Sequence, residues 1–135
     1  MKLRSFAIAV LFAVTGAAQA ELLDDNDIQA SLIAVSNEMN QMTPIMVDED
    51  TRLDTTVALK RSFMYVYTLV AFDADEIDPD LFLDAIEPLV TREVCSSPDM
   101  AGFRDNNIDT LYVYRGKDGN QIASVTIKVS DCTAE

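Results

Sequence analysis

The 135-residue sequence contains no histidine. This absence removes the most common general base of enzymes and the most common metal-binding side chain. Glycine is scarce, with four residues in the whole chain, and no glycine-rich phosphate loop is present. The Gly-x-Ser-x-Gly motif of serine hydrolases is missing as well. The sequence therefore predicts a protein that is not an enzyme and that has no cofactor.

Acidic residues are abundant, yet their spacing does not match a calcium-binding loop. In an EF-hand loop that began at Asp73, the sixth position requires glycine but holds Asp78. We therefore expect no metal site, and we expect this stretch to be a solvated turn that leads into a helix. A pair of carboxylates for glycoside hydrolysis stays open in principle, although nothing in the sequence marks one pair.

Long apolar runs are absent, apart from one near the N-terminus. Lys2 and Arg4 precede an apolar stretch at 6–14, and Ala18-Gln19-Ala20 follows it. This is the layout of a secretory signal peptide with cleavage after Ala20. The apolar stretch is about half of the roughly 20 residues that a membrane-spanning helix needs. We therefore expect no stable membrane insertion after cleavage.

The predicted cleavage divides the chain into a signal peptide, residues 1–20, and one exported domain, residues 21–135. A length of this order suits a single compact domain. Cysteine is absent from residues 1–20, so no lipid-attachment motif is present. The predicted location is the periplasm or the medium.

Basic residues are few, with 10 lysines and arginines against 23 acidic residues and a net charge of −13. Two of the basic residues precede the predicted cleavage, so the exported domain has a charge of 8 − 23 = −15. A field of this sign repels nucleic acid and anionic lipid and attracts cationic partners. The charge favours a basic protein as partner, although it could also serve solubility alone.

Cysteine occurs only twice, as Cys95 and Cys132. In an oxidising compartment an even count of this kind predicts one disulfide. A crosslink over this span would stabilise the fold by about 3 to 4 kcal/mol. The Cys-x-x-Cys spacing of redox-active pairs is missing, so a structural role is favoured.

Apolar spacing predicts a helix over 26–42, with Asp24 and Asp25 at its start and Thr43-Pro44 after its end. Its predicted buried stripe consists of Ile28, Leu32, Val35, Met39 and Met42. A second helix is expected after Asp78, with a kink or break at Pro88. Ser97 is expected to cap a short third helix.

Strand patterns are expected at 44–47, 51–59 and 62–72, followed by a C-terminal hairpin that turns at 116–120. In the first long strand, Leu53, Val57 and Leu59 are expected to share one face. In the hairpin, Leu111 and Val113 are expected to face the core together with Ala123, Val125, Ile127 and Val129. Tyr112 and Tyr114 would then lie on the opposite face.

All four tyrosines fall in the triplets Tyr65-Val66-Tyr67 and Tyr112-Val113-Tyr114. If the two strands are neighbours, their rings form one cluster, which is core when a helix covers it and a binding platform when it is open. We expect a partly buried core. The residues that we nevertheless predict as partner contacts are Tyr112, Tyr114, Asp48, Glu49, Asp50, Asp73, Asp75 and Glu76.

Together these patterns predict an α+β domain in which an N-terminal amphipathic helix packs on an antiparallel sheet of four to five strands. A second helical segment precedes the C-terminal hairpin, and one disulfide is present. The layout resembles small exported bacterial proteins, which include periplasmic immunity proteins, inhibitors of envelope hydrolases and, less closely, secretion-system pilotins. The missing lipid-attachment motif argues against a pilotin.

The resemblance and the charge imply an acidic protein-binding module that inhibits a cationic envelope enzyme or toxin. One alternative is an assembly factor of the envelope or of a secretion system that binds a partner strand. A second alternative is a periplasmic protein without catalytic activity.

Overall fold

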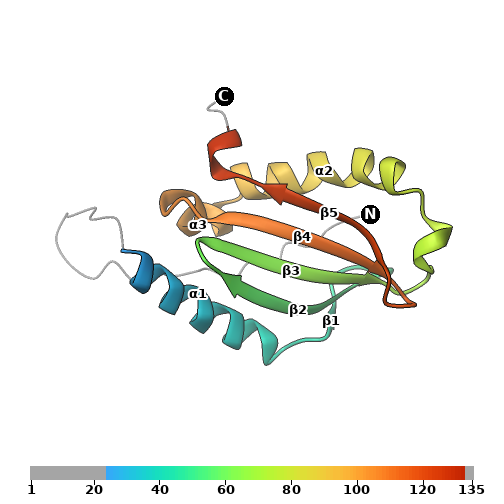
Figure 1. Cartoon of the computed structure of the whole chain (residues 1–135), viewed down its shortest axis with the longest axis horizontal. Helices are drawn as coiled ribbons and strands as arrows, with labels where there is room; N and C mark the ends of the chain where they lie inside the picture. The colour runs from blue at the N-terminus through green and yellow to red at the C-terminus, as the bar shows by residue number, and fades with distance from the viewer. Residues whose placement is uncertain (1–23, 133–135) are drawn as a thin grey trace.

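The computed structural model describes residues 24–132, which form a five-stranded mixed sheet with helices against one of its faces (Figure 1). The helices are α1 (Asp25–Asn40), α2 (Pro79–Ser96) and α3 (Ala101–Asp105), and the 3₁₀ turns are η1 (Ala74–Glu76), η2 (Pro98–Met100) and η3 (Val129–Asp131). The strands are β1 (Ile45–Met46), β2 (Thr51–Leu59), β3 (Ser62–Leu69), β4 (Asp109–Gly116) and β5 (Gln121–Ile127). The predicted α+β class is confirmed, whereas the predicted signal peptide lies outside the described residues.

The strands follow one another across the sheet in sequence order, and β3 and β4 are the one parallel pair. The prediction of a purely antiparallel sheet was therefore wrong at this pair. A parallel pair requires a long crossover, and the segment 70–108 provides it with α2. A helix of 18 residues is about 27 Å long, which matches a strand of eight residues at about 3.3 Å each.

The predicted helix starts are confirmed. The Asp24 side chain accepts a hydrogen bond from the backbone N–H of Asp27, and Asp78 caps α2 in the same way. Helix α1 ends two residues earlier than predicted, which leaves Met42 52% exposed rather than in the buried stripe. A kink or break was expected at Pro88, and helix α2 continues through this residue without a break. Asp84, whose carbonyl loses its N–H donor to the proline, is exposed, so water can satisfy it.

The three helices all pack on the same face of the sheet, which we call the covered face. Ser36 of α1 contacts Thr56, and the ring of Phe103 in α3 packs on Phe63. In α2, Phe82 packs edge-on against Tyr114. Among the described residues, every buried hydrophobic side chain belongs to one core cluster on this face, except Val66 and Val113. We call the opposite side of the sheet the open face.

A β-bulge at Asp54 reverses the side-chain order of β2. Before the bulge Leu53 pairs with Tyr67, and after it Thr55 pairs with Val66, so strand β2 contains one extra residue. One extra residue turns every later side chain to the opposite face. Leu53 therefore faces the helices while Val57 and Leu59 face the other way. The prediction that the three residues share one face was wrong for this reason.

A second bulge lies between β4 and β5. The turn itself is close to the predicted one, because the N–H of Gly116 donates to the carbonyl of Asn120 and Gly119 has a positive φ of 83°. The register then shifts between Tyr114 and Arg115. After the shift, Tyr112 lies opposite Val125 on the covered face. The prediction that Tyr112 and Tyr114 lie opposite the core face was wrong for this reason.

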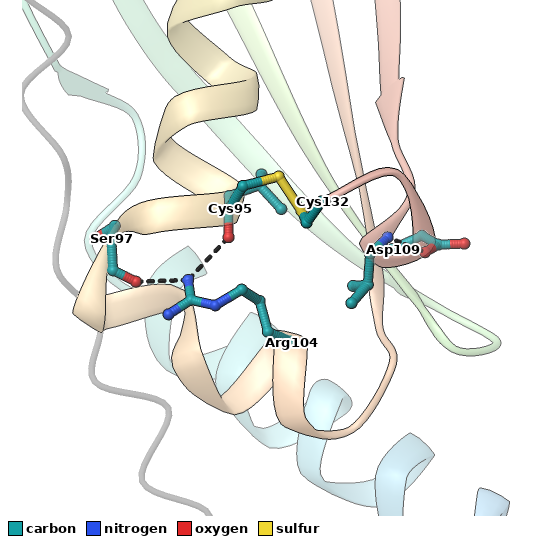
Figure 2. The surroundings of a disulfide bond; sticks show 7 residues. Cys95, Ser97, Arg104, Asp109 and Cys132 are labelled. Carbon is teal, nitrogen blue, oxygen red and sulfur yellow. Dashed lines mark hydrogen bonds between the residues drawn. A yellow bond between two sulfur atoms is a disulfide. The ribbon is translucent and has the colours of Figure 1, made fainter. Parts of the chain in front are cut away.

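The disulfide between Cys95 and Cys132 is present, with a Cα–Cα distance of 5.2 Å. It joins the C-terminal end of α2 to the segment that follows β5 (Figure 2). Beside it, the Arg104 guanidinium donates to the carbonyls of Val94 at 2.9 Å and Ser97 at 2.7 Å. The predicted bridge is confirmed, and Arg104 satisfies carbonyls at the end of α2 that have no partner within the helix.

Hydrogen bonds from α1 close the edge of β2. Strand β1 pairs only with Arg52 and Leu53. Farther along, the Asn40 amide accepts from the N–H of Thr56 at 2.8 Å and donates to its carbonyl at 2.9 Å. The Ser36 hydroxyl donates to the same carbonyl at 3.0 Å. One amide side chain thus replaces a strand partner at an edge that could otherwise pair with another chain.

We predict that Asn40→Ala lowers the free energy of unfolding by about 1 to 3 kcal/mol, because it removes the acceptor of the Thr56 backbone N–H and one of the donors to the Thr56 carbonyl. The matched control is Asn37→Ala, an exposed position on the same helix, for which we expect a change within about 0.5 kcal/mol. Urea denaturation followed by circular dichroism measures both. Equal losses in the two variants would contradict the assigned role of Asn40.

Candidate partner-binding surface

The four tyrosines stack in the centre of the covered face. Strands β3 and β4 run in register, so that Tyr65 lies beside Tyr112 and Tyr67 beside Tyr114. The ring centroids of these pairs are 5.3 and 5.2 Å apart, with nearly parallel planes. Tyr114 is fully buried, and Phe82 of α2 contacts its ring at 4.9 Å. The predicted four-ring cluster is confirmed, and it is part of the core.

Burial raises the pKa of all four phenols above the ordinary value for tyrosine. Burial is the largest cause for each of them. The carboxylate of Glu93 further raises the pKa of Tyr65, and neighbouring phenols do the same for Tyr67 and Tyr112. The tyrosine stack (Tyr65, Tyr67, Tyr112 and Tyr114) is therefore stable only while its hydroxyls are neutral.

We predict that the free energy of unfolding is constant through neutral pH and falls as the pH rises above about 10, where tyrosines of the unfolded chain ionise. The sign follows because the folded state holds protons that the unfolded state releases. Urea denaturation at increasing pH, together with tyrosinate absorbance, measures the effect. Tyr67→Phe should reduce the slope because one titrating group is removed. Full tyrosinate absorbance in the native protein at the ordinary tyrosine pKa would contradict the prediction.

The acidic residues predicted as partner contacts lie in two loops at one end of the sheet. Asp48, Glu49 and Asp50 connect β1 to β2, and the Asp50 carbonyl accepts from the N–H of Val70, near the second loop. In that loop, Glu76 accepts from the N–H of Asp73 at 2.7 Å. The two loops therefore lie close together.

Several of these carboxylates shape their own turns. Asp48 accepts from the backbone N–H groups of Asp50 and Thr51 at 2.9 and 2.7 Å. Glu49 and Asp75 are exposed. The structure does not join this acidic end to an exposed tyrosine surface, since Tyr112 and Tyr114 are buried. Partner contact by these eight residues stays a prediction.

The strand registers arrange the open face as a grid with four rows. Across β2, β3, β4 and β5, the first row is Arg52, Thr68, Arg115 and Gln121, and the second is Thr55, Val66, Val113 and Ser124. The third row is Val57, Met64, Leu111 and Thr126, and the fourth is Leu59, Ser62 and Asp109. The centre of the grid is apolar, and its first row carries two arginines.

We define the apolar patch as Val57, Leu59, Met64, Val66, Leu111 and Val113. Val57, Met64 and Leu111 are half-buried, and Leu59 is 36% exposed. Val66 and Val113, in the middle, are 3% and 8% exposed and lie outside the core cluster. Helices α1 and α2 lie along the two edges of the sheet, against β2 and β5 (Figure 1). Within residues 24–132, no helix packs on this patch.

The polar groups around the patch are paired unevenly. Arg52 forms an ion pair of 2.5 Å with Asp54, which also accepts from the Thr68 hydroxyl. Asp109 accepts from the N–H of Val129 at 3.0 Å. Arg115 is exposed, and it forms no ion pair within the described part of the chain. The first row thus contains one unpaired cation.

Sequence reasoning missed the apolar patch. The available signal was that β3 has apolar or aromatic residues on both of its faces, with Phe63, Tyr65 and Tyr67 on one and Met64 and Val66 on the other. Because of the two bulges, the sequence did not show which side chains of the neighbouring strands lie beside β3 on the open face. Without the bulge at Asp54, Val57 and Leu59 would lie on the same face as Leu53.

A separate groove of about 730 Å³ lies between α2 and the segment after β5, beside the disulfide. Its lining mixes Asp84, Glu87 and Arg92 with Pro88 and Thr91. Residues 24–132 contain no group of three histidine, cysteine or acidic side chains placed to hold a metal ion. In the same range, no helix has the length and apolar character needed to cross a membrane.

Comparison with known proteins identifies the fold. No protein-family pattern matches the chain, and no curated protein sequence matches it. A solved structure of a Pseudomonas aeruginosa protein that is thought to be secreted is similar, with a TM-score of 0.68 and 17% identity. The similarity covers 87% of this chain and 100% of that one.

Two pilotins of type II secretion systems share the fold as well. EpsS from Vibrio vulnificus has a TM-score of 0.65 and 12% identity, over 82% of this chain and 96% of its own. AspS from Vibrio cholerae has a TM-score of 0.60 and 10% identity, over 80% and 94%. At these identities the similarity establishes a common fold.

Proposed function

We propose that this protein is an exported, non-catalytic assembly factor of the cell envelope that binds another protein, as a pilotin-like component of a secretion system. The fold shared with EpsS and AspS supports this proposal, and so does the predicted signal peptide. The observation that carries it is the apolar patch on the open face. An apolar surface that is partly accessible and has polar residues around it is typical of a protein-binding site.

The partner segment lies across the open face in this proposal, rather than pairing with a sheet edge. Strand β1 is only two residues long, and Asn40 occupies the neighbouring edge of β2. At the other side of the sheet, α2 packs along β5 (Figure 1). The patch extends over three strands spaced by about 4.8 Å, which is close to the diameter of one helix, about 10 Å. A helical partner segment fits this surface better than an added strand.

The inhibitor function expected from the sequence has no support from the comparisons. It rested on an acidic surface that attracts a cationic partner, whereas the open face carries an exposed cation in Arg115. The missing lipid-attachment motif was an argument against a pilotin, and it concerns residues outside the described range. It stays an objection to a lipid-anchored pilotin, but not to an assembly factor that acts without an anchor.

Site-specific photo-crosslinking in the native host tests the proposal. A photoreactive residue at Met64 should crosslink one envelope component of a secretion system, because Met64 lies within the apolar patch. The same residue at Ile33, which is 45% exposed on α1, is the matched control and should not. Leu111→Asp should reduce the Met64 crosslink by about tenfold or more, since it places a charge in the apolar contact.

Folding of each variant is checked by circular dichroism and by formation of the Cys95–Cys132 bridge. Equal crosslinking at Met64 and Ile33 in folded protein would contradict the proposed surface. If the partner that crosslinks at Met64 is a hydrolase or a toxin, the result would instead support the inhibitor alternative.

A further inference from the structure

Charge is distributed unevenly over the two sides of the sheet. The open face carries the charged residues Arg52, Arg115, Lys128, Asp54 and Asp109, which sum to 3 − 2 = +1. The whole chain has a net charge of −13. The negative excess is therefore carried by the helices and the loops, and not by the face with the apolar patch.

The two acidic side chains of the open face are already engaged. Asp54 is bound by Arg52 and by the Thr68 hydroxyl, and Asp109 binds the backbone at Val129. Arg115 is exposed at the end of β4, one row from Val113 on the same strand. Its guanidinium is an exposed donor group beside the apolar patch, and two parallel N–H donors match a carboxylate.

We propose that the partner segment carries a carboxylate that binds Arg115 and thereby fixes the direction of the segment on the open face. This inference rests on the proposed function. Adjacent rows of the grid are about 7 Å apart, as two strand residues require. One helical turn advances about 5.4 Å. An Asp or Glu one turn beyond the last apolar contact would therefore reach the first row.

The negative charge of the rest of the molecule makes this interaction selective. An acidic segment is repelled by the excess of acidic residues on the helix side of the protein, whereas Arg115 offers it an exposed cation beside the apolar patch. Charge pairs at the margin of an interface determine orientation and discrimination more than total affinity. Arg115 therefore selects which apolar segments bind and in which direction.

Two synthetic amphipathic helical peptides test the inference. Both peptides are about 18 residues long and have the same apolar face. One turn beyond that face, one peptide carries Glu and the other carries Lys. Fluorescence polarisation with the exported, oxidised protein should show about tenfold tighter binding of the Glu peptide. Arg115→Glu should reverse this preference. Arg92→Glu makes the same charge change on the exposed surface of α2 and should leave the preference unchanged.

The outcomes separate the two proposals. If both peptides bind equally and Met64→Asp abolishes binding of both, the open face binds apolar segments and the role of Arg115 is wrong. Tighter binding of the Lys peptide would likewise overturn the role of Arg115. If neither peptide binds, or if Arg92→Glu has the same effect as Arg115→Glu, the open face is not the selective surface that we infer.

Discussion

The parallel, in-register pairing of β3 with β4 is the interaction on which the rest of the structure depends. It places Tyr65 beside Tyr112 and Tyr67 beside Tyr114, so that four rings form one stack under the helices. The same register places Val66 beside Val113 on the opposite side. A shift of one residue in either strand would turn the valine of that strand toward the helices and its two tyrosines to the open face. One register thus determines both the core and the candidate binding surface.

Local signals in the sequence were sufficient for much of the fold. Helix α1 begins at a capping aspartate, α2 begins after Asp78 with Pro79 in its first turn, and the two cysteines form the bridge that the predicted export implied. Each of these features depends on residues close together in the chain or on the compartment. The parallel pairing of β3 with β4 has no local signal, because it depends on the length of the crossover that α2 supplies.

The side-chain directions were less predictable than the strands themselves. Alternation was read correctly along β4, yet Tyr112 and Tyr114 were assigned to the wrong face. One bulge beside Arg115 and one at Asp54 are enough to reverse the assignment. A bulge leaves a single residue of the strand unpaired, which is a small cost in free energy. Burial of large aromatic rings changes the free energy of folding far more. The core therefore determines where the bulges fall, and the hairpin pattern alone cannot.

The two edges of the sheet explain how the protein can carry an apolar patch on which no helix of residues 24–132 packs. A sheet with free edges and an apolar face is prone to pair with copies of itself. Here Asn40 and the short β1 block one edge. Helix α2 lies along the other edge, and the disulfide joins the C-terminal end of α2 to the segment after β5. Contact with another chain is thereby directed to the face. In the interaction that we propose on that face, affinity comes from the burial of apolar side chains, and discrimination comes from the arginine beside them.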